Sequence, residues 1–407
     1  MNKGDIAWML MSSSLVLLMT PAVGMFYGGM VRRKNMISTM MKSFATIAII
    51  SLLWVNVGYS LAFGNDHWSL IGGFQWLGLK GVSMSEPNPA YALTIPHLLY
   101  MLFQMKFAVI APALIIGAFV ERIRFSAFMA FIVLWSLLVY CPVAHWVWGI
   151  GGWLKQLGAL DFAGGAVIHI TAGVAALAIA LIIRKRKDFG QIDTAHSNLP
   201  LVLLGTVFLW VGWFGFNGGS ALEASPLAVH AVITTTVATS AAALTWMALS
   251  WRKGLPNLMG MAVGSVVGLV AITPACGYVD IFSATLIGVI ATIVSYNCIK
   301  IRLKLHIDES LDVWACHGMA GTWGALATGI FASKAINPAG ADGLIYGNPH
   351  QLVVQAISVA AVWVFTFAVS FVIAKVLDLT MGLSVTEDEE EMGLDLTQHG
   401  EVAYNIE

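Results

Sequence analysis

The sequence predicts an all-α integral membrane protein with eleven transmembrane helices, arranged as an inverted five-helix repeat plus one extra helix. Three observations support this fold class. The 407-residue chain is 58% hydrophobic and only 11% charged, which leaves too little polar surface for a soluble protein of this length. Many apolar windows reach 18 residues or more, the length that crosses a bilayer as a helix. Two histidines, His169 and His317, also stand at matching places in the two halves of the chain.

The apolar runs are uninterrupted, which favours helices over the alternating strands of a membrane barrel. An odd number of spans would place the two ends of the chain on opposite sides of the membrane. The expected spans are Ile6–Gly29, Ser38–Phe63, Leu93–Phe119, Ser126–Ile150, Phe162–Ile183, Asn198–Asn217, Leu227–Trp251, Leu258–Cys276, Ile281–Lys300, Leu311–Ala332 and Leu352–Val376.

The first five spans, about 6–183, can be matched to the next five, about 198–332, and an eleventh span follows at about 352–376. Because five is odd, the second set would run through the membrane in the opposite sense. Transport proteins built this way place their site at the repeat interface, near the midplane. Residues 1–383 would form the membrane domain, and 384–407 a polar tail. Its acidic run is usually a solvated segment, and a docking role is the sharper alternative.

The basic residues predict the orientation, because cytoplasmic loops collect Lys and Arg. Alternate loops contain Arg32–Lys34, Arg122, Arg124, Arg184–Lys187, Arg252, Lys253, Lys300, Arg302 and Lys304, whereas the other side has only Lys3, Lys80, Lys155 and Lys334. We therefore expect the N-terminus outside and the C-terminal tail in the cytoplasm, with the protein in the inner (cytoplasmic) cell membrane.

The two histidines are the strongest functional signal. His169 lies in GGAVIHITAGVAALAIALII and His317 in VWACHGMAGTWGALATGIFA. An ionisable group at bilayer depth is costly and marks a pathway, and two neutral imidazoles can pass a proton or an N–H along a dry path. One buried histidine would more simply pack and bond a backbone carbonyl. Two at equivalent depths favour a pore.

The depth of each histidine follows from its distance to a preceding acid. His169 follows Asp161 by eight residues, and His317 follows Glu309 by eight. At the helical rise this predicts about 12 Å between each acid and its histidine. Because the two spans enter from opposite faces, both rings would approach the middle of a hydrocarbon layer of about 30 Å.

Asp161 opens the predicted fifth span in GALDFAGG, where a carboxylate can accept hydrogen bonds from free N–H groups of a helix N-terminus. This structural role is favoured over cation coordination. Zinc requires three or four suitably spaced ligands. Only Asp161 and Asp312 could join the histidines, without a recognised spacing, and the four cysteines form no CxxC pattern. We therefore expect neither a metal nor a cofactor.

Aromatic residues near the span ends have two interpretations. Most tryptophans at such depths form a membrane-interface belt, but a cluster facing a vestibule could bind a small cation by cation–π attraction, with a serine hydroxyl accepting one N–H. The candidates are Phe103, Phe107, Trp148, Trp210, Trp213, Phe214, Phe216 and Ser220. The sequence leaves open which of them converge.

Longer segments resemble the ammonium transporter (Amt/Mep/Rh) family, on its Amt branch, close to bacterial ammonium channels. They are PAVGMFYGGMVRRKN, GAFVERIRFSA, PVAHWVWGIGG, LGALDFAGGAVIHI, WVGWFGFNGGSA, TPACGY, the HG of ACHGMAG and LDLTQHGEVAY. The resemblance runs nearly end to end. It implies eleven helices, the inverted repeat, a homotrimer with one pore per subunit, and transport of ammonium rather than an enzymatic reaction.

The resemblance also assigns roles to individual residues. The family's outer recruitment site resembles Phe107, Trp148 and Ser220, and its two stacked gate rings resemble Phe107 and Phe216. The paired pore histidines resemble His169 and His317, Trp213 a pore-lining tryptophan, and Asp161 the structural acid. The Trp and Ser of the recruitment site favour the Amt branch over the Rh branch.

Lys106 departs from the family pattern, because the Amt branch generally has a small or polar residue there. In one interpretation its side chain points about 100° away from Phe107 and snorkels or faces a neighbour. In the other, its ammonium group lies near the pore and repels NH₄⁺. The second favours a different class of function, a non-conducting or weakly conducting ammonium sensor coupled through the tail to an output domain such as a histidine kinase.

Other partners and classes follow from the same resemblance. A trimeric PII signalling protein often regulates the family from the inner face, where the loop Arg184–Lys187 and the tail could form a dock. The ligand would be NH₄⁺ or NH₃, membrane lipid would surround the spans, and no nucleic-acid partner is expected. An intramembrane enzyme using His169 and His317 as acid and base is disfavoured, because no nucleophile or metal constellation accompanies them.

Overall fold

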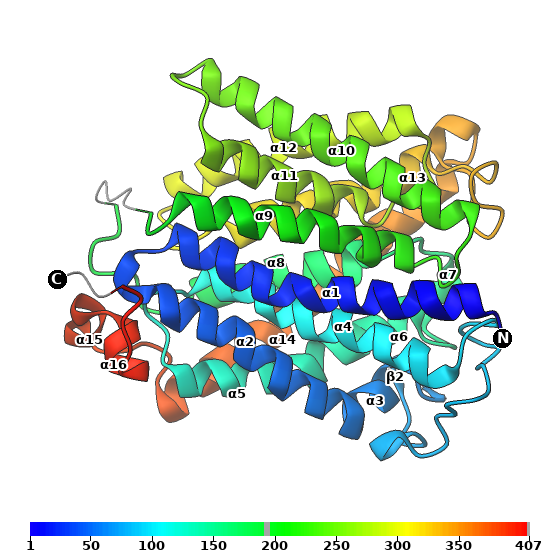
Figure 1. Ribbon diagram of the computed structural model, residues 1–407, viewed down its shortest axis with the longest axis horizontal. Helices are drawn as coiled ribbons and strands as arrows, with labels where there is room; N and C mark the ends of the chain where they lie inside the picture. Colours follow the sequence, from blue (N-terminus) through cyan, green and yellow to red (C-terminus); the bar gives the residue numbers. More distant parts are fainter. Residues whose placement is uncertain (191–195, 405–407) are drawn as a thin grey trace.

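The computed structural model describes residues 1–190 and 196–404; residues 191–195 and 405–407 lie outside the described residues. The molecule is a bundle of long helices aligned along one axis (Figure 1). Its α-helices are α1 (Lys3–Met30), α2 (Met36–Leu53), α3 (Tyr59–Phe63), α4 (His97–Ile115), α5 (Phe125–Trp135), α6 (Cys141–Trp148), α7 (Trp153–Leu157), α8 (Thr171–Ala180), α9 (Leu199–Trp213), α10 (Pro226–Trp251), α11 (Leu258–Ile272), α12 (Ile281–Lys304), α13 (Ala320–Phe331), α14 (Pro349–Met381), α15 (Glu387–Met392) and α16 (Leu394–His399).

Segments of π-helix interrupt or begin several spans. They are η2 (Trp54–Gly58), η5 (Ser136–Tyr140), η6 (Gly165–Ile170), η7 (Phe214–Gly218) and η8 (Trp314–Met319). Such widened turns are rare and often occur at functional sites. The strands β1 (Asp66–His67) and β2 (Ile71–Gly72) pair antiparallel, with Asp66 opposite Gly72.

Within the described residues, eight helices are long and apolar enough to cross a membrane. Two further predicted spans correspond to shorter apolar helices, Gly165–Ala180 and Leu258–Ile272, and the tenth to η8 followed by α13. The mostly helical structure with apolar spans agrees with the predicted all-α membrane fold class, apart from the short β1–β2 pair, whereas the count of eleven spans stays a prediction. The two ends of the chain lie at opposite ends of the bundle (Figure 1).

Polar residues set the starts of the helices. Asn198, Asn257 and Asp280 each accept a backbone N–H of the first helical turn, at 2.7–2.8 Å. Pro226 and Pro349 stand at first helical positions, where the missing N–H is not needed. These residues end the polar loops and start the apolar spans at defined points.

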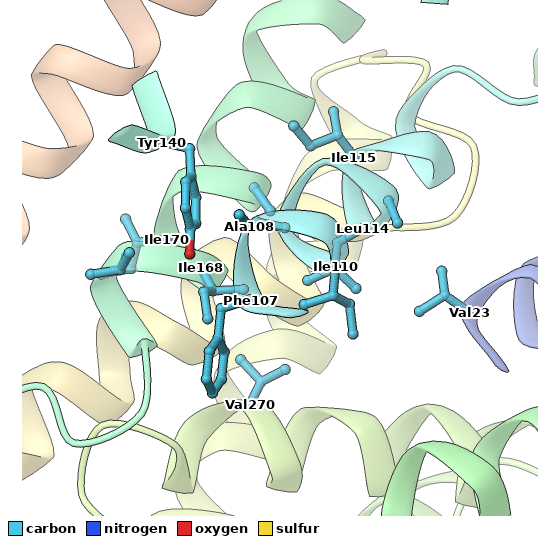
Figure 2. Close-up of a cluster of buried hydrophobic side chains, with 14 of the residues drawn as sticks. Val23, Phe107, Ala108, Ile110, Leu114, Ile115, Tyr140, Ile168, Ile170 and Val270 are labelled. Carbon is cyan, nitrogen blue, oxygen red and sulfur yellow. The ribbon is translucent and has the colours of Figure 1, made fainter. Parts of the chain in front are cut away.

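The centre of the bundle lies around α4. Its buried face, which includes Phe107, meets side chains from η5, η6 and α11, among them Tyr140, Ile168 and Val270 (Figure 2). Most of α4 is buried, and only Leu98, Leu102 and Lys106 are partly exposed. Because these three are four residues apart, they form one narrow stripe along the helix.

The C-terminal tail is folded against basic loops of the bundle and is not simply a solvated segment (Figure 1). Glu390 accepts hydrogen bonds from the Arg184 side chain at 2.5 Å and from the Lys187 backbone N–H at 2.9 Å. Asp395 accepts the N–H groups of Ile37 and Ser38 at 3.0 and 2.7 Å, which caps the start of α2. Opposite charge on the loop and the tail explains this docking.

Candidate functional site

The two histidines meet inside the bundle. Their Nδ1 atoms are 3.3 Å apart, and the ring centroids are 5.4 Å apart at 25°. The rings are only 1% and 3% exposed for His169 and His317. At this distance one Nδ1 donates its hydrogen and the other accepts it, so the two Nδ1 atoms share one proton. Within the described chain the Nε2 of His169 has no hydrogen-bond partner.

Equivalent local structures present the two rings. His169 lies on η6 and His317 on η8, and each π-helix continues into an α-helix, α8 and α13. The two segments cross very closely where Gly173 faces Gly318. A Cβ atom on Gly173 would lie 2.1 Å from the backbone nitrogen of Gly318. Only glycine permits this crossing, which brings the two imidazoles within hydrogen-bonding distance.

Acidic residues hold the starts of both π-helices. The Asp161 carboxylate accepts four backbone N–H groups, those of Gly164, Gly165, Ala166 and Val167, at 2.6–3.2 Å. Burial raises its pKa, and these hydrogen bonds act in the opposite direction. Because η6 begins only at Gly165, the predicted 12 Å of helix between acid and histidine is wrong: Asp161 lies in the loop before the helix.

Glu309 has the corresponding position before η8. Both of its carboxylate oxygens accept the N–H of Trp314, at 3.0 and 3.2 Å. Burial and the nearby Asp312 carboxylate raise the pKa of Glu309 to about 8. Asp312 accepts a hydrogen bond from Arg302 at 2.6 Å instead of approaching a histidine. In residues 1–190 and 196–404, no group of three or more His, Cys, Asp or Glu side chains is arranged to hold a metal ion.

Aromatic rings cover one side of the histidine pair. Phe107 and Phe216 are 4.5 Å apart by ring centroids and are 1% and 0% exposed. Their planes meet at 78°, so they pack edge to face and not as the parallel stack that the family resemblance suggested. Phe216 and Trp213 lie 5.9 and 5.4 Å from the His169 ring, nearly parallel to it. Trp213 donates its indole N–H to Thr273 Oγ1 at 2.9 Å, which fixes the ring.

A cavity of about 390 Å³ opens on the other side of this constriction. Phe107, Trp148 and Ser220 all line it, and the Phe107 and Trp148 rings are 6.1 Å apart. Trp148 donates its indole N–H to the Asp161 carbonyl at 3.0 Å. The Ser220 hydroxyl donates to the Phe216 carbonyl at 2.8 Å, which leaves the hydroxyl oxygen able to accept an N–H.

A second cavity, of about 430 Å³, reaches the pair from the opposite end. It is lined by His317, Cys316 and Tyr27, among others, and extends to charged residues such as Arg32 and Asp188. Tyr27 donates its hydroxyl to the Leu114 carbonyl at 3.0 Å, 87 residues along the chain. Sequence reasoning missed this second cavity, because its lining comes from helices without a shared motif. Three lining residues of the first cavity, Tyr91, Gln104 and Lys155, were missed for the same reason.

Lys106 belongs to neither of these two cavities among the described residues. It lies on the partly exposed stripe of α4, while its neighbours Met105 and Phe107 are buried. Its Nζ contacts the Met105 sulfur at 3.8 Å. Phe107 lines the 390 Å³ cavity and Lys106 does not, which favours the first interpretation of the sequence over a lysine in the pore.

Comparisons with known proteins identify the family. The sequence model of the Ammonium Transporter Family matches residues 7–404. An ammonium transporter of Bacillus subtilis is 50% identical over 99% of both chains, and Amt1 of Archaeoglobus fulgidus is 47% identical over 99% of this chain and all of that one.

Solved structures agree with this match. Mep2 of Saccharomyces cerevisiae superposes with a TM-score of 0.88 at 32% identity, covering 95% of this chain and 88% of that one. A structure described as a "Sensor Amt Protein" has a TM-score of 0.87 at 30% identity, covering 97% and 98%. The chain belongs to the ammonium transporter family.

Proposed function

We propose that this protein transports ammonium across the cytoplasmic membrane by recruiting NH₄⁺ outside, deprotonating it and passing it along the histidine pair. The observation that supports this best is the buried His169–His317 contact, which separates two cavities that open toward opposite ends of the bundle. The family is one of transporters and not of enzymes, and no enzymatic reaction is needed to explain the site.

The cavity lined by Phe107, Trp148 and Ser220, which we call the outer cavity because the proposed orientation places it outside, suits recruitment of a small cation. An ammonium ion that enters hydrocarbon loses its hydration at a large energetic cost. The faces of Phe107 and Trp148 can replace part of that shell by cation–π attraction, and Ser220 Oγ can accept one N–H. The Phe107–Phe216 contact then excludes water and hydrated metal ions.

The histidine pair favours ammonia over potassium. Because the Nδ1 atoms of His169 and His317 share one hydrogen, one ring keeps an Nε2–H as a donor and the other presents its Nε2 lone pair as an acceptor, which match the lone pair and the N–H groups of NH₃. K⁺ has neither a proton to release nor an N–H to donate. We infer that NH₄⁺ releases its proton near the constriction and that the ammonia and the proton then pass separately.

The assembly follows the family expectation. We propose eleven membrane helices, a homotrimer with one pore per subunit, and a cytoplasmic C-terminal tail docked on the inner loops. That docked face, with Arg184 and Glu390 at its centre, is where a PII-type signalling protein would bind.

The sensor function is the second candidate. It is favoured by the likeness to a structure described as a sensor Amt protein, in which case the tail would couple to an output domain. The main argument for a sensor from the sequence was the interpretation that places the Lys106 ammonium group near the pore. Since Lys106 lies on the partly exposed stripe and outside both cavities, we prefer transport.

Flux decides between the two. Purified protein in liposomes with an inward ammonium gradient should give a transient current or a change in internal pH, and His169→Leu should abolish it without unfolding the protein. Lys106→Ser should conduct like the wild-type protein. The sensor function would be supported instead if well-folded wild-type protein carries no flux and Lys106→Ser restores it.

A further inference from the structure

The outer cavity contains a cation that belongs to the protein itself. Lys155 lies on α7 and lines the same cavity as Phe107, Trp148 and Ser220. Its Nζ donates a hydrogen bond to the Trp148 carbonyl at 2.9 Å and lies 5.9 Å from the centroid of the Tyr91 ring. The second distance is within the range of a cation–π contact. Lys155 therefore places a primary ammonium group, the side-chain analogue of NH₄⁺, in the expected recruitment cavity.

The charge of this cavity is unusual for a site that collects a cation. Among the described residues that line it, only Lys155 and Asp161 are charged. The Asp161 carboxylate is buried and already accepts four backbone N–H groups. Clefts that attract a cation normally have the opposite sign of charge at their mouth. The positive charge of Lys155 thus opposes entry of the proposed substrate.

The same wall offers acceptors that suit an N–H-bearing cation. The Trp148 carbonyl and the face of Tyr91 are both engaged by the Lys155 ammonium. Gln104 also lines the cavity, is 8% exposed, and its Oε1 has no hydrogen-bond partner within the described chain. Its amide nitrogen donates to the Tyr100 hydroxyl at 3.2 Å. A free cation entering the cavity would find these acceptors next to Trp148.

We propose that the Trp148 carbonyl and the Tyr91 ring form a second cation subsite in the outer cavity, and that Lys155 occupies it as a tethered cation. In this position Lys155 lowers the affinity of the cavity for ammonium and sets the concentration at which transport saturates. The inference rests on the proposed function, since it assigns an affinity-determining residue to the same cavity.

The simpler role for Lys155 is structural. Trp148 is the last residue of α6, and a lysine that bonds a free carbonyl at a helix C-terminus stabilises that helix. Both roles use the same hydrogen bond. Only the tethered-cation role predicts that ammonium affinity depends on the charge of residue 155.

The experiment measures ammonium flux into liposomes as a function of ammonium concentration. Lys155→Gln removes the charge, and Lys155→Arg keeps it. Lys80→Gln removes an exposed outer lysine that lies outside this cavity and controls for net charge. We expect Lys155→Gln to lower KM by about three- to tenfold at low ionic strength, with unchanged maximal flux. This gain should shrink as NaCl is added, because salt screens the charge.

Lys155→Arg and Lys80→Gln should keep KM within about twofold of the wild-type value. The proposal is overturned if Lys155→Gln leaves KM unchanged or raises it. It is also overturned if Lys155→Gln and Lys155→Arg change KM by the same factor. If the wild-type protein carries no flux, the transport function fails separately. The affinity is then read from the rise in melting temperature of the purified protein with NH₄Cl against NaCl. In this measurement, the melting temperature of Lys155→Gln must reach half of its maximal rise at a lower ammonium concentration than that of the wild-type protein. If the two proteins reach half of the rise at the same ammonium concentration, the inference is overturned.

Discussion

At the scale of single residues, the site depends on how polar atoms are satisfied away from water. His169 and His317 share one Nδ1 hydrogen at 3.3 Å, while the carboxylate of Asp161 uses both oxygens to hold the start of η6. A buried carboxylate that accepts four N–H groups is stabilised by them, whereas the same carboxylate without these partners would destabilise the fold by its lost hydration. Asp161 therefore positions the helix that bears His169.

Asp161→Asn tests this positioning role. The substitution removes the charge and turns an amide NH₂ toward backbone N–H donors. We expect a loss of ~2–4 kcal/mol of stability, measured as a lower melting temperature of the purified protein, together with reduced ammonium flux. Asp280→Asn is the matched control, because Asp280 caps α12 through one N–H at 2.7 Å and Asn is an equally good cap. Equal losses in the two variants would contradict the role assigned to Asp161.

At the scale of elements, the approach of two helices sets the distance between the histidines. The crossing of α8 and η8 has no room for a side chain at Gly173, since a Cβ there would lie 2.3 Å from the Gly318 Cα. Backbone atoms cannot move aside as the end of a flexible side chain can. The separation of the imidazoles is thus a property of this contact between segments 148 residues apart.

Gly173→Ala should separate the histidines. We expect the two segments to move apart, the Nδ1–Nδ1 contact to lengthen beyond hydrogen-bonding distance, and ammonium flux to fall by at least about tenfold, at a cost of ~1–3 kcal/mol in stability. Flux in liposomes and melting temperature measure the two effects. Gly254→Ala is the control, because no described atom lies within 4 Å of a Cβ built at that position. Wild-type flux from Gly173→Ala would show that the close crossing is not required.

At the scale of the whole molecule, ion pairs tie distant segments together. Arg186 bonds Asp308 at 2.7 Å and Glu121 at 3.2 Å, and Arg32 bonds Glu121 at 2.9 Å. Arg122, fully buried, donates to the Asp308 carbonyl at 2.5 Å. The tail adds its acidic helix to this surface through Arg184. These ion pairs therefore form a network that joins segments far apart in the chain.

This network predicts an acid-dependent loss of stability. Burial opposes ionisation of Asp308, but Arg122 and Arg186 outweigh it and lower its pKa. A carboxyl with a lowered pKa stabilises the fold above its ordinary pKa of about 4, and this contribution is lost as pH falls through the lowered value. Melting temperatures between pH 3 and 7 should fall on the acid side for the wild-type protein. Asp308→Asn should be ~3–5 kcal/mol less stable at pH 7 and vary less with pH, and an identical pH profile would refute the assignment.

Tail docking makes a separate prediction at this scale. Asp395→Ala removes the carboxylate that caps α2 through Ile37 and Ser38, so the tail should detach more often and become more sensitive to limited proteolysis, by about tenfold in rate. Glu387→Ala changes an exposed residue of the same tail and should leave the rate near that of the wild-type protein. Equal cleavage of both variants would argue against this anchor.

Much of this protein was predictable from its sequence, because the physics involved acts over single segments. Apolar runs longer than a bilayer specify membrane helices, ionisable residues inside such runs stand out by their cost, and Asp161 before a glycine-rich helix start has an evident capping role. The family resemblance then named the pore residues. The shape of the molecule as a bundle of apolar helices and its membership of the ammonium transporter family were therefore evident before the structure.

Only the tertiary structure decided how these segments face one another. Periodicity does not specify how far each helix is rotated about its axis or where it crosses another, so the sequence left open whether Lys106 points toward Phe107. It also hid the docking of the tail, the edge-to-face packing of Phe107 and Phe216, and the presence of Lys155 in the outer cavity. These features depend on contacts between residues far apart in the chain, which hydrocarbon thickness and helical repeat do not constrain.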